Sequence, residues 1–216
     1  MGQDPSQHLS PVWSRYTNIL VDRAEGAYIY GGEGRRYLDF TSGIGVTNTG
    51  HCHPRVVQAV QEQVATLIHV PNTWHIEAQG RWAELLSKHS FGGKAFFCNS
   101  GTEANEAAIK IARLYGHQKK IKNPAIIVME NSFHGRTLAT LSATGNRKVQ
   151  AGFEPLVSGF IRVPYDDLEA VRTIAGNNRA VVAVLVEPIQ GEGGLALVTQ
   201  HTGYLANIEL YRVQAP

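Results

Sequence analysis

Two short, continuous apolar runs limit the fold of this chain more than any other feature. Residues 125–129 and 181–186 contain only apolar side chains, which is typical of strands buried on both faces of a parallel sheet. Residues 160–163 form a third β-prone run, and segments with helical periodicity separate the runs. Because strands and helices alternate from residue 94 to residue 187, the sequence predicts an α/β fold with a mostly parallel sheet and right-handed crossovers.

The first third of the chain has a different pattern. Residues 27–30 and 35–40 are β-prone and flank a glycine-rich turn at 31–34, so they predict a hairpin. Pro54 suits the first turn of a helix. The apolar face of this helix is expected at Val56, Val57, Val60, Val64 and Leu67. A second helix is expected over residues 76–89.

The turn at residues 99–101 connects an apolar run at 95–98, predicted to end a buried strand, to a helix with small apolar residues at every third or fourth position. Ser100 or Thr102 can cap this helix. The free N–H groups of a helix N-terminus bind anions, and Gly101 lets a phosphate approach the backbone. The alternative is an ordinary, well-capped turn. The loop is neither a P-loop nor a dinucleotide-binding motif, so a nucleotide is not expected.

Three polar loops follow predicted strands, at residues 99–102, 131–136 and 187–194. Because ligands of parallel sheets bind beyond the carboxyl ends of the strands, these loops are expected to form one site. They offer N–H groups, an aromatic ring beside an arginine, and a carboxylate beside an amide. This combination suits an anionic ligand with a planar ring.

Each candidate side chain in these loops also has a structural alternative. Phe133 can stack on a planar ligand or fill the core. Arg136 can bind a carboxylate or phosphate, or lie on a helix surface. Glu187 ends an apolar strand, where a charge is costly unless it is paired or used, so a functional role is favoured. His134 is predicted to fix its loop by hydrogen bonds rather than to act as a base.

The composition argues against several classes of partner. The chain has 43% hydrophobic and 18% charged residues and a formal net charge of +2, so neither nucleic acid nor a membrane is expected as a partner. Two lone cysteines and a polar N-terminal stretch favour a cytoplasmic location. His51-Cys52-His53 suggests a metal site, but adjacent ligands do not easily share one tetrahedral ion, so no metal is expected.

Several motifs resemble those of class III pyridoxal-phosphate-dependent aminotransferases over residues 16–195. The strongest are residues 99–107, 132–138 and 187–194, which read Asn-Ser-Gly-Thr-Glu-Ala-Asn-Glu-Ala, Ser-Phe-His-Gly-Arg-Thr-Leu and Glu-Pro-Ile-Gln-Gly-Glu-Gly-Gly. Supporting stretches are residues 37–45, 50–54, 141–145 and 152–156. Within the family, the similarity is greatest to the branch that uses N-acetylornithine as amino donor.

The resemblance implies an incomplete fold type I of the PLP-dependent transferases, with pyridoxal 5′-phosphate as cofactor. Residues 1–66 are expected to form an N-terminal arm and a segment of a smaller α+β domain, and residues 67–216 part of the large cofactor-binding domain. The implied cofactor-binding residues are Ser100, Gly101, Thr102, Phe133 and Gln190. Arg136 is expected to bind the substrate carboxylate. Glu187 is expected to help the site alternate between substrates, by pairing with an arginine beyond this chain.

The implied reaction moves an amino group from N-acetylornithine, or a related ω-amino donor, to 2-oxoglutarate in arginine biosynthesis, in a homodimer. Ornithine, 4-aminobutyrate and succinylornithine are alternative donors. An aminomutase, a fragment that only binds ligand or partner subunits, and a general sugar-phosphate-binding domain are further alternatives. The family's Schiff-base lysine and ring-nitrogen aspartate would follow residue 194, so the 216-residue chain alone is expected to be inactive and marginally stable. Residues 198–216 depart from the family pattern.

Overall fold

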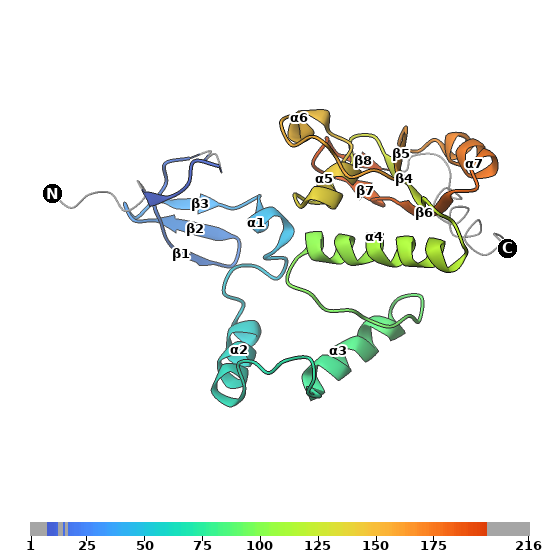
Figure 1. Cartoon of the computed structure of the whole chain (residues 1–216). Helices are drawn as coiled ribbons and strands as arrows, with labels where there is room; N and C mark the ends of the chain where they lie inside the picture. Colours follow the sequence, from blue (N-terminus) through green and yellow to red (C-terminus); the bar gives the residue numbers. More distant parts are fainter. Residues whose placement is uncertain (1–7, 13–14, 16, 198–216) are drawn as a thin grey trace. The chain divides into compact units, whose positions relative to one another are not determined.

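The computed structural model describes residues 8–12, 15 and 17–197 (Figure 1). The chain divides into two compact units, Met1–Arg81 and Trp82–Pro216, and the division falls inside helix α3 (Glu77–Lys88). The predicted domain boundary between residues 66 and 67 stays a prediction. The predicted departure at 198–216 lies outside the described residues.

The first unit contains a three-stranded antiparallel sheet in the order β1-β2-β3. Its strands are β1 (Val21–Glu25), β2 (Tyr28–Gly31) and β3 (Arg36–Leu38). Tyr28 pairs with Leu38 and Tyr30 with Arg36, which confirms the predicted hairpin. Arginine side chains lie over both tyrosine rings, Arg36 over Tyr28 and Arg23 over Tyr30. Both contacts are cation–π pairs on the rings of strand β2.

A left-handed turn, α1 (Ser42–Gly45), follows the sheet, and all four of its residues have positive φ. Asp39 anchors it, because one carboxylate oxygen accepts hydrogen bonds from the N–H groups of Thr41 (2.8 Å) and Ser42 (3.1 Å). The other oxygen lies 2.7 Å from His51 Nε2. Hydrogen bonds from Thr41 and His51 hold the pKa of Asp39 well below its usual value. His51 therefore has a structural partner in this unit.

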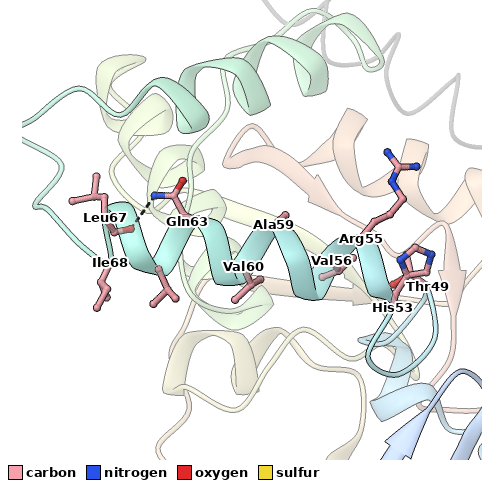
Figure 2. A pocket seen from close by; sticks show the side chains of 10 residues that line it. Thr49, His53, Arg55, Val56, Ala59, Val60, Gln63, Leu67 and Ile68 are labelled. Carbon is pink, nitrogen blue, oxygen red and sulfur yellow. Dashed lines mark hydrogen bonds between the residues drawn. The ribbon is translucent and has the colours of Figure 1, made fainter.

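Helix α2 (Pro54–Thr66) begins at Pro54, as predicted. Its apolar face is exposed to solvent, however, with Val60 59% and Val64 51% exposed. Figure 2 shows Val56 and Val60 projecting along one side of α2, beside an open groove of about 750 Å³. The helical periodicity identified the face correctly, but no other described element of the unit covers it.

The second unit is built on a three-stranded parallel sheet in the order β5-β4-β6 (Figure 1). The strands are β4 (Ala125–Met129), β5 (Phe160–Val163) and β6 (Val181–Leu185). Helices α4 (Gly101–Gln118) and α5 (Leu138–Ala143) pack on one face and α7 (Leu168–Asn177) on the other. The two buried clusters are Ile109, Ile126, Val128 and Ala143, and Ile127, Met129, Val163 and Val171. The predicted parallel α/β sheet is therefore confirmed.

Two segments differ from the sequence-based expectation. Residues 95–98 do not form a strand, because no described strand pairs with them; Phe96 is 69% exposed, and the Phe97 ring stacks on Trp82 at 4.8 Å. A small hairpin of β7 (Ile189–Gln190) and β8 (Ala196–Leu197) follows β6 and was not predicted. Helix α6 (Arg147–Gln150) completes the unit. Within the described part of the chain, every helix is too short or too polar to cross a membrane.

Candidate functional site

The first turn of α4 forms one side of the candidate site. Ser100 is the N-cap, and its Oγ accepts a hydrogen bond from the N–H of Glu103 at 3.2 Å. The Glu103 carboxylate accepts in turn from the N–H of Asn99 at 2.7 Å. These bonds leave the N–H groups of Gly101 and Thr102 without a partner among the described residues. An 18-residue helix thus presents two free donors and the positive end of its dipole.

The loop after β4 forms the second side, and hydrogen bonds fix it at consecutive peptides. The N–H of Phe133 donates to Glu187 Oε2 at 3.0 Å, and the N–H of His134 donates to Thr144 Oγ1 at 3.0 Å. The His134 carbonyl accepts from Asn105 Nδ2 at 2.8 Å. The half-buried ring of Phe133 lies beside Arg136, whose guanidinium carbon is 5.5 Å from the ring centroid.

His134 lies inside this loop and is only 3% exposed. Its backbone makes the loop hydrogen bonds, while Nε2 of its ring is buried without a partner among the described residues. Burial lowers the pKa of His134 to about 4, and the nearby Arg162 acts in the same direction. The imidazole is therefore neutral at pH 7, and the loop is fixed by the backbone of His134 rather than by its ring.

The segment after β6 forms the third side. Burial raises the pKa of the Glu187 carboxyl, although the hydrogen bond from Phe133 opposes this shift. Tyr165 Oη donates to the carbonyl groups of Glu187 (3.1 Å) and Pro188 (2.9 Å) and so fixes the end of the strand. Gln190 is buried, and its Nε2 donates to the Glu130 carbonyl at 2.8 Å. This bond holds β7 against the end of β4.

Gly135 brings the loop into contact with the first turn of α4. A Cβ atom at this position would lie 3.0 Å from Thr102 Cβ and 2.6 Å from Thr140 Oγ1, and its φ is +135°. By contrast, a Cβ atom at Gly101 would meet nothing within 4 Å. The loop therefore packs tightly against α4 at Gly135, while the space around the Cα of Gly101, on the side where a side chain would lie, stays open.

The second unit thus brings the predicted residues to one end of its sheet. Thr102, which follows Ser100 and Gly101 in the first turn of α4, packs against Gly135 of the Phe133–Arg136 loop, and Glu187 is joined to the same loop by its hydrogen bond. Sequence reasoning missed Asn105 and Thr144, although both lie inside the quoted motifs. Their partner, the His134 backbone, is 29 and 10 positions away, and no local pattern shows such a contact.

Two other features of the described residues do not belong to this site. The groove along α2 is lined by none of the predicted site residues. No group of three or more His, Cys, Asp or Glu side chains in the described ranges is arranged to hold a metal ion.

Comparison with known proteins identifies a family. The family model described as aminotransferase class-III matches residues 9–209. Acetylornithine aminotransferase of Nitrosomonas europaea is 60% identical over 189 residues, which is 87% of this chain and 48% of the relative. Acetylornithine aminotransferase of Gloeobacter violaceus is 51% identical over 190 residues, 88% of this chain and 47% of the relative. The chain spans about half the length of the curated relatives it matches.

Solved structures agree with this result. The crystal structure of ornithine aminotransferase from Toxoplasma gondii matches with a TM-score of 0.87 at 28% identity, over 95% of this chain and 48% of that chain. A second structure of that enzyme is described with partial occupancy of PLP at its active site. Acetylornithine aminotransferase from Elizabethkingia anophelis matches with a TM-score of 0.77 at 28% identity, over 95% and 48% of the two chains. The predicted fold is thus confirmed, and the chain belongs to the class III aminotransferase family.

Proposed function

We propose that this chain supplies the phosphate-, ring- and carboxylate-binding half of an aminotransferase site, and that the whole protein transfers an amino group from N-acetylornithine to 2-oxoglutarate in arginine biosynthesis. The observation that carries the proposal is the close packing of Gly135, in the Phe133–Arg136 loop, against the side chain of Thr102 in the first turn of α4, the turn that holds the free N–H groups. The 60% identity to an acetylornithine aminotransferase supports the choice of donor.

The first turn of α4 fits the phosphate of pyridoxal 5′-phosphate, the cofactor of class III aminotransferases. A phosphate dianion needs several donors and an approach free of side-chain atoms, and Gly101 and Thr102 offer both. The Ser100 hydroxyl is used in the helix cap, where it accepts from the N–H of Glu103 and not from those of Gly101 and Thr102. Thr102 adds a half-buried hydroxyl on the side of Gly135.

The loop after β4 fits the ring of the cofactor and the substrate. The half-buried Phe133 can lie against one face of a pyridine ring and exclude water from it. The exposed Arg136 is then free to form two parallel hydrogen bonds with a substrate carboxylate. Glu187 and Gln190, which hold this loop and the end of β4, are proposed to line the same pocket.

Pyridoxal 5′-phosphate, when bound, supplies a ring that withdraws electrons from the amino-bearing carbon of the substrate. The residues of this chain bind and orient both molecules. We further propose that the full-length protein is a cytoplasmic homodimer, as the family resemblance implies.

The amino donor can be tested in a chimera, called the joined protein below, in which the matched 189 residues of this chain replace those of the Nitrosomonas europaea relative. The joined protein is expected to transaminate N-acetylornithine with 2-oxoglutarate, with a kcat/KM within about tenfold of the parent enzyme. Ornithine, 4-aminobutyrate and succinylornithine are expected to react more slowly. A folded joined protein that prefers one of these donors would refute the assignment of the substrate.

The carboxylate site has its own control in the same protein. Arg136→Leu is expected to lower kcat/KM by about 100-fold, because a charged hydrogen-bond pair is lost. Arg113→Leu removes an arginine that instead bonds the Ser158 carbonyl, and serves as the matched control. Equal losses in the two variants would show that Arg136 does not bind substrate.

A further inference from the structure

The peptide groups on both sides of Phe133 are held by side chains from separate elements. Its own N–H donates to Glu187 at the end of β6, and the next N–H, that of His134, donates to Thr144 Oγ1 at 3.0 Å. The carbonyl of His134 accepts from Asn105 on α4 at 2.8 Å. These bonds fix the backbone on both sides of Phe133 and so restrict the positions that its ring can occupy.

Thr144 is buried, and its hydroxyl is oriented to accept the hydrogen bond from His134. It is 1% exposed, and its hydroxyl donates to the Thr140 carbonyl at 2.9 Å, so its lone pairs face His134. Without this acceptor, the N–H of His134 would lose its only partner among the described residues, which is costly for a buried donor. Asn105 adds the connection to α4, the helix whose first turn carries the free N–H groups.

We infer that Asn105 and Thr144 are positioning residues, which fix the N–H and the carbonyl group of His134 so that Phe133 is held at the distance from α4 that the cofactor ring requires. The inference rests on the proposed function. Neither side chain needs to touch the cofactor. Their effect on binding acts through Phe133, and this makes the inference distinguishable from a general contribution to stability.

The loop itself is tested by hydrogen exchange in the 216-residue chain. Thr144→Val keeps the side-chain shape and removes the acceptor, so the amides of residues 132–136 are expected to exchange at least about tenfold faster. Thr144→Ser restores the hydroxyl and is expected to match the wild type. Ser142→Ala is the structural control, because Ser142 Oγ, on the helix that Thr144 follows, accepts from the N–H of Val157 rather than from the loop.

Cofactor binding is measured in the joined protein, with pyridoxal 5′-phosphate as the probe. Thr144→Val and Asn105→Ala are each expected to weaken its binding about tenfold and to change the visible circular-dichroism band of the bound cofactor. Ser142→Ala is expected to leave both unchanged. In a Phe133→Ala background, Thr144→Val is expected to cause no further loss, since the residue through which it acts is gone.

The outcomes separate the two proposals. If the joined protein binds no pyridoxal 5′-phosphate, the proposed function is refuted, and the inference about cofactor positioning is refuted with it. If it binds, but Thr144→Val and Ser142→Ala have equal effects, the inference is wrong and the function stands. An additive loss in the Phe133→Ala background would likewise overturn the inference, because Thr144 would then act independently of the ring.

Discussion

At the scale of single residues, the burial of His134 in a loop of the candidate site makes the free energy of unfolding depend on pH. Its imidazole is 3% exposed, and burial lowers its pKa to about 4. In the unfolded chain the same group has an ordinary pKa of about 6.5. Between these values the unfolded state binds a proton that the folded state does not. The titration of His134 therefore costs no free energy of unfolding well above pH 6.5, and its cost grows as the pH falls from about 6.5 toward 4.

This difference gives a quantitative prediction. The free energy of unfolding of the wild type is expected to fall by about 3 kcal/mol more than that of His134→Gln between pH 6.5 and pH 4, as measured by urea unfolding at several pH values. The exposed His75, changed to Gln, controls for the loss of one imidazole. If the wild type and His134→Gln gave parallel curves across this range, His134 would not be buried as a neutral group.

Residue types in the loops could be predicted from the sequence, but their partners could not. Phe133, Arg136 and Glu187 are visible as unusual side chains at the ends of apolar runs. Asn105 and Thr144 are not, because an amide in a helix and a threonine after one have many ordinary roles. Only the fold shows that both reach the backbone of the same residue, His134. The roles proposed for the visible residues remain predictions.

At the scale of elements, the space between α4, α5 and the loop after β4 sets a limit on side-chain size. Gly135 has a φ of +135°, and a Cβ atom there would lie 2.6 Å from Thr140 Oγ1. Gly101, at the first position of α4, has a negative φ and open space around it. Two glycines within the same candidate site therefore differ sharply in what they tolerate.

The two glycines provide a matched pair of variants. Gly135→Ala is expected to lower the free energy of unfolding by about 2 kcal/mol or more, through backbone strain and overpacking. Gly101→Ala is expected to change it by less than about 1 kcal/mol. Denaturant unfolding monitored by tryptophan fluorescence measures both. Similar losses in the two variants would mean that the loop does not pack against α4 as described.

The elements that could be predicted are those that are determined by the residues within them and directly beside them in the sequence. The strands β4 and β6 and the start of α2 at Pro54 follow from composition and turn residues alone. The prediction that residues 95–98 form a strand was wrong, because an apolar run becomes a strand only when a neighbouring strand forms hydrogen bonds with it. The short β7–β8 hairpin was missed because two-residue strands carry no periodicity.

At the scale of the whole molecule, many large apolar side chains are exposed on the described surface. The predicted apolar face of α2 is exposed, and Ile111 and Leu114 of α4 are exposed in the second unit. Soluble monomers rarely leave large apolar patches in water. The chain spans about half the length of its curated relatives. The exposed apolar side chains can therefore be tested directly in the 216-residue chain, by dye binding and by its free energy of unfolding.

The last prediction concerns this exposure. In the 216-residue chain, the double variant Val60→Ser, Val64→Ser is expected to bind less of a dye that fluoresces on apolar surfaces. Its free energy of unfolding is expected to change by less than about 1 kcal/mol, because both side chains already contact water. Ile109→Ser, at a position only 2% exposed, is expected to cost about 3 kcal/mol or more. If the double variant were destabilised as strongly as Ile109→Ser, the face of α2 would be packed in solution, and a second copy of the chain would be the first occupant to test by sedimentation.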